Sequence, residues 1–294
     1  MILIADSGST KTAWRLTDYS TEQGKEVLTQ GINPYHQDED EICAILRHEI
    51  YPHISDHASY IEHIYFYGAG CTKEKSPMVA NALRQTLTPT ARISVESDML
   101  GAARSVCGHQ KGIVCILGTG SNSCFYDGRE LHPGIPALGY ILGDEGSGAY
   151  IGRRLVSDIL KHQLPEDIRQ HFFAESKETE ATIIQKVYRT PFPNRYLAHL
   201  SPFCHRHRHH PAIHALLVDC FSQFFIRNIL PNPWTHNAIS SHTVHCVGSI
   251  AYHYQAELTE AACAHGIQLG TVVQSPLEGL ALYHKDLIDT TSAD

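Results

Sequence analysis

Apolar and polar positions along the first third of the chain predict short strands followed by alternating helices and strands. An apolar run at residues 2–5 stops at Asp6, and alternation resumes beyond a turn of small residues, which predicts a hairpin. A third extended segment is expected from residue 25. Apolar residues at helical spacing then alternate with short apolar runs. They predict helices at 38–50, 79–87 and 99–106, and strands at 64–67 and 91–95.

The same order begins again near residue 112. A strand at 112–117, a turn at 118–121 and a returning strand at 123–126 are expected, with Asp127-Gly128 as a hairpin signal. A mostly helical stretch follows to about residue 234. Strands at 243–247 and 271–273 and a helix from Pro276 close the chain. The pattern predicts an α/β protein of two related halves, each a mixed sheet with flanking helices, with a helical insertion in the second.

Composition narrows the class of protein. A length of 294 residues favours two domains, and the formal charge of −8 speaks against a nucleic-acid surface. We find neither an apolar run of membrane-spanning length nor a signal peptide, so we expect a cytoplasmic protein without membrane partners. The nine cysteines are odd in number and include no C-x-x-C pair, so disulfides are not expected. Cys115, Cys220 and Cys246 lie in apolar runs and are expected to be buried.

Three expected strands end in turns of small residues: residues 6–12, residues 118–122 and Gly248-Ser249. Such turns let backbone N–H groups approach a phosphate closely, although tight hairpins alone would also explain a single one. The first turn is not a P-loop, because Thr10 precedes Lys11 and the required glycine is absent. The second is followed by a strand, which argues against a dinucleotide fingerprint.

Together these motifs resemble a known superfamily. Residues 6–12 (DSGSTKT) resemble the first phosphate motif of the actin/heat-shock-chaperone/sugar-kinase superfamily, and residues 118–122 (GTGSN) resemble its second. Residues 247–250 (VGSI) resemble its adenosine loop. Residues 143–148 (GDEGSG) are similar to the signature of N-acetylglucosamine kinases and of the ATPase family named after the benzoyl-CoA reductase activators. The motifs occur in family order along nearly the whole chain.

The resemblance implies two ribonuclease-H-like (actin-like ATPase) domains around a central cleft. Residues 1–110 would form the first domain, joined by a C-terminal helix at 276–294. Residues 111–275 would form the second, with the insertion at about 150–240. ATP and Mg²⁺ would be the cofactors and a small sugar the substrate.

Two aspartates are the candidates for the chemistry. Asp6 is a candidate Mg²⁺ anchor, because Mg²⁺ prefers carboxylate oxygens; the alternative is a cap on the hairpin turn. Asp98 follows a strand and precedes a helix. It could be the general base that accepts the proton of the attacking hydroxyl, or only the N-cap of that helix. The resemblance favours Asp98 as the base, because the catalytic aspartate of these kinases occupies the equivalent strand end.

The remaining candidates are turn residues. The resemblance implies nucleotide contacts from Gly8, Ser9, Thr10, Lys11, Thr12, Gly118, Thr119, Gly120, Gly248 and Ser249. It implies sugar contacts from Asn33, Ser121, Asn122 and Asp144, with Asp98 at the reacting hydroxyl. Lys11 could equally be a solvated turn residue, and Asn33 a turn former before Pro34. Glu145 could assist the metal or fix its turn, and Gly68-Ala69-Gly70 could face the cleft or be a plain left-handed turn.

Two features do not follow the pattern of the sugar kinases. Leu138 stands about where those kinases carry a tryptophan of the sugar pocket, so the identity of the sugar is open. Residues 204–214 hold five histidines, at 205, 207, 209, 210 and 214. They could capture a metal, but the interleaved Arg206 and Arg208 favour a polar loop between helices, and we assign no metal there.

The leading hypothesis is an ATP-dependent kinase that phosphorylates a hydroxyl of a small sugar, especially an amino sugar such as N-acetylglucosamine or glucosamine; it could be a homodimer. A first alternative is an ATPase that activates a partner reductase. Such activators hold an iron–sulfur cluster between two subunits, and the scattered cysteines count against it. A second is a sugar or nucleotide sensor with weak catalysis.

Overall fold

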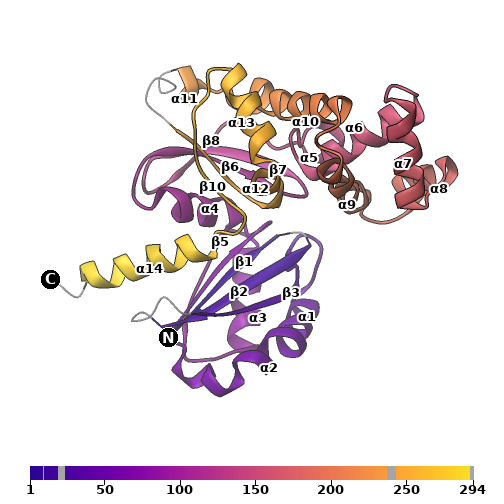
Figure 1. The fold of residues 1–294 in the computed structure, drawn as a ribbon. Helices are drawn as coiled ribbons and strands as arrows, with labels where there is room; N and C mark the ends of the chain where they lie inside the picture. Colours follow the sequence, from indigo (N-terminus) through magenta and orange to yellow (C-terminus); the bar gives the residue numbers. More distant parts are fainter. Residues whose placement is uncertain (9, 19–23, 237–242, 292–294) are drawn as a thin grey trace. The chain divides into compact units, whose positions relative to one another are not determined.

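The computed structural model describes residues 1–8, 10–18, 24–236 and 243–291. The chain forms two compact units (Figure 1). The first unit comprises Met1–Gln110, Gly128–Glu130 and Ser275–Asp294; the second comprises Lys111–Asp127 and Leu131–Gln274. Among the described residues, no helix has both the length and the apolar character needed to cross a membrane.

The sheet of the first unit has five strands in the order β3-β2-β1-β4-β5 (Figure 1). The strands are β1 (Ile2–Ser7), β2 (Lys11–Thr17), β3 (Gly24–Gln30), β4 (His63–Gly68) and β5 (Arg92–Ser97). The first three form an antiparallel meander, and β4 and β5 add in parallel to the other side of β1. The helices are α1 (Glu39–Ile45), α2 (Tyr51–Ile54), α3 (Ser76–Thr86), α4 (Asp98–Cys107) and α14 (Leu277–Thr291), with the π-turn η1 (Leu46–Ile50) and the 3₁₀ turn η2 (Ser55–Tyr60).

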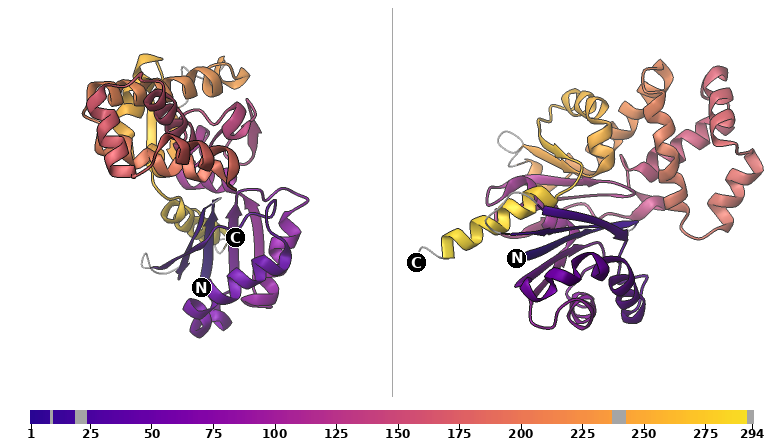
Figure 2. Two further views of the ribbon diagram at one scale, coloured as in Figure 1. Left: turned by 90° about the vertical axis from the view of Figure 1, so that its right-hand side faces the viewer. Right: turned by 60° about the horizontal axis from the view of Figure 1, so that its bottom comes forward.

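Both faces of this sheet are covered, which explains why β1 is apolar at successive positions. Leu3 and Ala5 lie in the core shared with α1 and α3. Ile2 and Ile4, which alternate with them, pack instead with Tyr67 and with Leu277 of α14. Figure 2 shows α14 as the yellow helix that returns to the strands of the first unit. Because side chains alternate along a strand, Asp6 belongs to the face on which α14 and α4 pack.

The sheet of the second unit repeats this topology. Its strand order is β10-β9-β6-β7-β8. Strands β6, β7 and β8 correspond to β1, β2 and β3 of the first sheet, and β9 and β10 correspond to β4 and β5. The strands are β6 (Gly112–Leu117), β7 (Ser121–Tyr126), β8 (Leu131–Pro133), β9 (Val244–Val247) and β10 (Leu269–Val273). The meander β6-β7-β8 is antiparallel, and β9 and β10 are parallel to β6. The predicted α/β class with two mixed sheets is confirmed.

Helices make up most of the second unit. They are α5 (Gly139–Leu142), α6 (Gly148–Leu160), α7 (Glu166–Ser176), α8 (Glu180–Arg189), α9 (Pro193–Arg206), α10 (Pro211–Phe224), α11 (Pro233–His236), α12 (Ser249–His253) and α13 (Gln255–Ala264), with the π-turn η3 (Phe225–Ile229). One core joins β6 and β9 to α6, α9, α10 and α13. Cys115, Cys220 and Cys246 are fully buried in it, as predicted.

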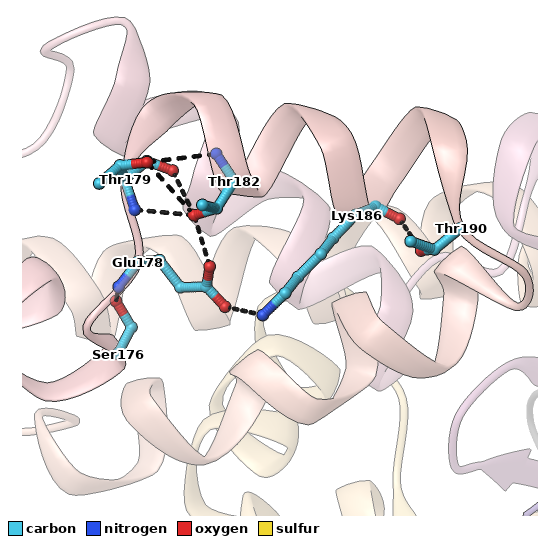
Figure 3. A network of polar contacts seen from close by, with 6 residues as sticks. All are labelled: Ser176, Glu178, Thr179, Thr182, Lys186 and Thr190. Carbon is cyan, nitrogen blue, oxygen red and sulfur yellow. Dashed lines mark hydrogen bonds and ion pairs between the residues drawn. The ribbon is translucent and has the colours of Figure 1, made fainter.

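Polar contacts fix the outer helices of the insertion. Thr179 caps α8 by accepting a hydrogen bond from the N–H of Thr182 at 3.2 Å (Figure 3). The Thr182 hydroxyl in turn donates to Glu178 at 2.6 Å, and Glu178 pairs with Lys186 one turn further along the helix. A buried carboxylate therefore ties the α7–α8 connection to the middle of α8.

Candidate functional site

Asp6 and Asp98 form a pair of carboxylates in the first unit. Asp6 is the second-last residue of β1, and Asp98 is the first residue of α4, directly after β5. Only β4 separates β1 from β5, and all three are parallel, so their carboxyl ends meet at one edge of the sheet. The two carboxylates are close enough for the charge of Asp98 to raise the pKa of Asp6.

Burial makes both groups hard to ionise. Burial first and the charge of Asp98 second raise the pKa of Asp6 to about 7, while Lys11 opposes the shift. Burial likewise raises the pKa of Asp98, against hydrogen bonds from the N–H groups of Met99 and of Asp98 itself. A raised pKa makes a carboxylate a better proton acceptor. Two acidic groups with perturbed pKa values at one sheet edge are typical of a functional site.

The N-cap interpretation of Asp98 is wrong. Ser97, not Asp98, is the N-cap of α4: its hydroxyl accepts from the N–H of Leu100 at 3.2 Å. Asp98 Oδ1 accepts from the adjacent N–H of Met99, at 2.8 Å. The Asp6 carboxylate has no hydrogen bond to a residue that the structure describes, and Ser9 of the hairpin is outside that part of the chain, so the cap interpretation of Asp6 is not tested. The N–H of Gly8 donates to the carbonyl of Lys11 across the hairpin at 3.0 Å.

The residues of the turn beside Asp6 differ in their exposure to solvent. Thr10 and Lys11 are exposed, whereas Thr12 is fully buried. The Thr12 hydroxyl is 2.7 Å from that of Ser7 and donates to the carbonyl of Gln30 at 3.0 Å. The Thr12 hydroxyl therefore makes its hydrogen bonds within the protein and stabilises the fold. Ser9 lies outside the described residues.

Asn33 follows β3 and closes a turn of its own. Its Oδ1 accepts from the N–H of Tyr35 at 3.0 Å, and its own N–H donates to Gln37 at 2.7 Å. The turn interpretation therefore holds for the side-chain oxygen, while the side-chain NH₂ group makes no hydrogen bond to the described residues. Gly70, at φ +79°, packs against this amide: a Cβ there would lie 2.4 Å from Asn33 Oδ1. The Gly68–Gly70 turn therefore needs glycine both for its left-handed backbone and for this close approach.

In the second unit, the Gly118–Gly120 turn meets the predicted signature run at residues 143–148. The N–H of Gly148 donates to the carbonyl of Gly118 at 2.8 Å, and the N–H of Ala149 donates to Thr119 at 3.1 Å. Ser147 caps α6 by accepting from the N–H of Tyr150 at 3.1 Å. Sequence segments 30 residues apart are thereby joined at the start of one helix.

Asp144 lies against this turn. Its Oδ1 accepts from the N–H of Ser121 at 3.3 Å, and a Cβ on Gly120 would come within 3.0 Å of its Oδ2. Burial raises the pKa of Asp144, the N–H of Ser121 lowers it, and the charge of Glu145 raises it further. The backbone of Asp144 is left-handed, at φ +56°, which aspartate tolerates better than most residues. Asn122 is exposed, and its Oδ1 accepts from the N–H of Ser123 at 2.8 Å.

The predicted adenosine loop lies next to the same turn. Strands β6 and β9 pair in parallel, with Ile116 opposite Val247. Gly248 follows, at φ +121°, and a Cβ on it would lie 2.4 Å from the carbonyl oxygen of Leu117. Ser249 then begins α12. The second unit thus brings Gly118–Gly120, Asp144 and Gly248 together, although they come from three separate parts of the sequence.

A residue that the sequence analysis did not select is Asn228, in the π-turn η3. Its Nδ2 donates to Glu145 Oε2 at 3.1 Å. Only 9% of the Glu145 side chain is exposed. Asn228 stands in the apolar stretch at 224–230, so a polar residue at a mostly buried position was the one available signal.

The histidine-rich stretch is more helical than predicted. His205 and Arg206 belong to the last turn of α9, and His214 lies within α10, so only His207–His210 form the connection. The side chains pair mostly with carboxylates: Arg206 and His207 with Glu175, Arg208 with Glu257, His210 with Asp167 and His214 with Glu260. These contacts join α9 and α10 to α7 and α13.

Solved structures resemble this chain over nearly its whole length. The putative N-acetylglucosamine kinase of Porphyromonas gingivalis is 48% identical, with a TM-score of 0.92, over 97% of this chain and 99% of that one. This chain belongs to the N-acetylglucosamine kinase family. The family resemblance inferred from the motifs is therefore confirmed.

Solved structures of lower sequence identity share the fold. The protein of the same description from Chromobacterium violaceum is 18% identical over 96% of this chain and 99% of that chain, with a TM-score of 0.70. A ROK family glucokinase from Streptomyces griseus, solved with glucose and AMPPNP, is 16% identical over 97% and 98%, with a TM-score of 0.52. No protein-family model and no curated protein sequence matches the chain.

Proposed function

We propose that this chain is an ATP-dependent kinase that transfers the γ-phosphate to a hydroxyl of a small sugar, especially an amino sugar such as N-acetylglucosamine or glucosamine. The observation that carries the proposal is the 48% identity, over 97% of the chain, with a protein described as a putative N-acetylglucosamine kinase. The carboxylate pair Asp6 and Asp98 supports it, because phosphoryl transfer needs a base for the hydroxyl and an anchor for a cation.

In this mechanism Asp98 is the general base. One of its oxygens is held by the N–H of Met99, which fixes the carboxylate at the start of α4. Its raised pKa suits the acceptance of a proton from the attacking hydroxyl. The hydroxyl passes its proton to the carboxylate while its oxygen forms the new bond to phosphorus. The oxygen therefore never carries a full negative charge.

Asp6 fits a cation site. Its carboxylate is largely buried, has no hydrogen bond to a described residue and lies beside a second carboxylate, so a positive charge would relieve both burial and repulsion. Bound there, Mg²⁺ would supply charge neutralisation for the transferred phosphoryl group. Backbone N–H groups of Gly8, Thr10, Gly118 and Gly120, with the Lys11 cation, would hold the phosphates, and Gly248 and Ser249 the nucleoside. Asn33, Ser121, Asn122 and Asp144 would hold the sugar.

The reductase-activator alternative is disfavoured by the cysteines. All nine are free thiols, and all except Cys263 are buried. An iron–sulfur cluster shared between two subunits needs several thiolates at the surface. A sensor with weak catalysis remains distinguishable only by turnover. A homodimer and a cytoplasmic location stay predictions.

The test is a screen for ADP release with Mg²⁺ and a panel of sugars that includes N-acetylglucosamine, glucosamine, N-acetylmuramic acid and glucose. We expect one amino sugar to stimulate ADP release, with the phosphorylated sugar confirmed by mass. Asp98→Asn is the matched variant. It should keep its affinity for ATP and lower kcat by roughly a hundredfold or more. Sugar binding without turnover would support the sensor, and bound iron would support the activator; either result would contradict the proposal.

A further inference from the structure

Glu145 is a buried carboxylate to which, among the residues that the structure describes, one side chain donates a hydrogen bond. Its side chain is 9% exposed, and Asn228 Nδ2 donates to its Oε2 at 3.1 Å. The guanidinium of Arg227 is a longer contact: its Nε lies 3.9 Å from Oε1, and the Arg227 side chain is 63% exposed. Burying a carboxylate is costly unless its oxygens are satisfied. The position of Glu145 therefore depends mainly on Asn228.

The π-turn gives Asn228 its direction. Phe225 and Ile229, at the two ends of the turn, are fully buried, whereas Ile226 and Arg227, which precede Asn228, are exposed. A π-turn inserts one extra residue into a helix, a costly arrangement that is frequent at functional sites. Here the extra residue allows Asn228 to turn back toward the protein while its neighbours stay in solvent.

Asn228 is itself held from two sides through its carbonyl oxygen. The hydroxyl of Ser123, in β7, donates to it at 3.2 Å, and Asn232 Nδ2 donates to it at 2.5 Å. Asn232 also accepts, through Oδ1, from the N–H of Ile135 at 2.8 Å. The two asparagines thus hold Ile135 and Glu145, which are the two ends of the segment that carries Asp144.

The middle of that segment has little support from its own side chains. Leu138, Ile141 and Leu142 are 54%, 67% and 72% exposed. Its backbone is held by Arg153, whose Nη1 donates to the carbonyls of Tyr140 and Ile141 at 2.7 and 3.1 Å. Tyr140 packs against the core of the second unit, whereas Leu138, Ile141 and Leu142 are exposed. Apolar packing therefore holds the segment near one residue, and the polar anchors at its ends hold the part that carries Asp144.

We propose that Asn228 is a positioning residue for the sugar site: through Glu145 it holds the loop at residues 143–147, and so sets Asp144 against the Gly118–Ser121 turn. Asn228 touches neither substrate in this proposal, and Glu145 acts through the loop. The consequence for sugar binding rests on the proposed kinase function. The consequence for the loop does not, because it concerns three backbone amides: that of Ser147 donates to the carbonyl of Asp144, and those of Gly148 and Ala149 donate to the turn.

The experiment compares Asn228→Leu with the exchanged pair Asn228→Asp/Glu145→Gln. Leucine leaves the Glu145 carboxylate without its donor, whereas the exchanged pair restores one amide facing one carboxylate. Ile226→Ala, at an exposed position of the same turn, is the control. The measurements are amide hydrogen exchange at residues 147–149 and steady-state kinetics, which give kcat and the KM values for the sugar and for ATP.

We expect Asn228→Leu to speed exchange at residues 147–149 and to raise the sugar KM roughly tenfold or more, with kcat and the ATP KM changed less than threefold. The exchanged pair should restore exchange and KM, and the control should match the wild type. Unchanged exchange and KM in Asn228→Leu would overturn the proposal. An exchanged pair that restores exchange but not KM would also overturn it, because Glu145 would then contact substrate. If Asn228→Leu does not fold, the exchanged pair decides.

A wild-type protein that phosphorylates no sugar would contradict the proposed function alone. The exchange measurement would still decide whether Asn228 holds the loop.

Discussion

Asp6→Asn should make the protein more stable at alkaline pH. The pKa of Asp6 is about 7 in the folded protein and 3.8 as an isolated group, a difference of about 3 units. At 1.36 kcal/mol per unit, ionising Asp6 in the folded state costs about 4 kcal/mol more than in the unfolded chain. Asparagine has nearly the same shape and no charge, so it removes this cost.

The sign follows from proton binding. Because the folded state holds the proton more tightly, Asp6 contributes nothing unfavourable below about pH 3, where both states are protonated, and little at pH 4. Its destabilising contribution grows as the pH rises from 4 to 7 and is complete above about 8. The advantage of Asp6→Asn should therefore be near zero at pH 4 and roughly 2 to 4 kcal/mol at pH 8.

The assay is thermal and urea unfolding of both proteins, without nucleotide or Mg²⁺, at several values between pH 4.5 and 8.5. At pH 8 the unfolding midpoint of the variant should be higher by roughly 5 to 10 °C. Asp40→Asn, at an exposed carboxylate of α1, is the control and should shift stability by less than about 0.5 kcal/mol at every pH. A variant less stable than the wild type at pH 8, or equally stabilised at pH 4.5 and 8, would refute the reasoning.

Three further predictions test other parts of the molecule. Gly70→Ala should raise the sugar KM and leave the ATP KM unchanged, because the new Cβ would lie 2.4 Å from Asn33 Oδ1 and would displace that side chain; steady-state kinetics would check this. Gly152→Ala should destabilise the second unit by about 3 kcal/mol or more in urea unfolding, because its Cβ would lie 1.9 Å from a backbone carbonyl of α9. Glu175→Gln should lower the free energy of unfolding by up to about 1 kcal/mol at pH 7, and this loss of stability should shrink below pH 4.5. The reason is that a hydrogen bond from His207 lowers the pKa of Glu175.

The elements were predictable because both sheets have strong local patterns. The apolar run at residues 2–5 is read from sequence because both faces of β1 are covered, so no polar residue interrupts it. Gly112–Leu117 and the turn after it were found for the same reason. The histidine-rich stretch was predicted less well. Its helical ends depend on carboxylates of α7 and α13, which local periodicity does not contain.

The candidate residues were partly predictable, and their contacts were not. Asp6 and Asp98 stand at strand ends, where polar residues after apolar runs are conspicuous. Whether Asp98 caps its helix depends on one position, and sequence alone does not distinguish it from Ser97 beside it. Asn228 reaches Glu145 only because a π-turn changes its direction, and no local sequence signal predicts that irregularity.

The two sheets share one topology but present different chemistry at the ends of their first strands. In the first unit β1 brings Asp6 to the sheet edge beside Asp98, so a pair of charges marks this edge. In the second unit the corresponding strand, β6, ends in Ile116 and Leu117 and is followed by Gly118–Gly120, so backbone groups take that place. The nearest carboxylate there, Asp144, arrives from another segment and accepts a backbone N–H of the turn. Repetition of the fold therefore explains where the two edges are and why we propose phosphate-binding amides in the turns of both units. The departures from repetition explain why we assign proton transfer and cation binding to the first unit alone.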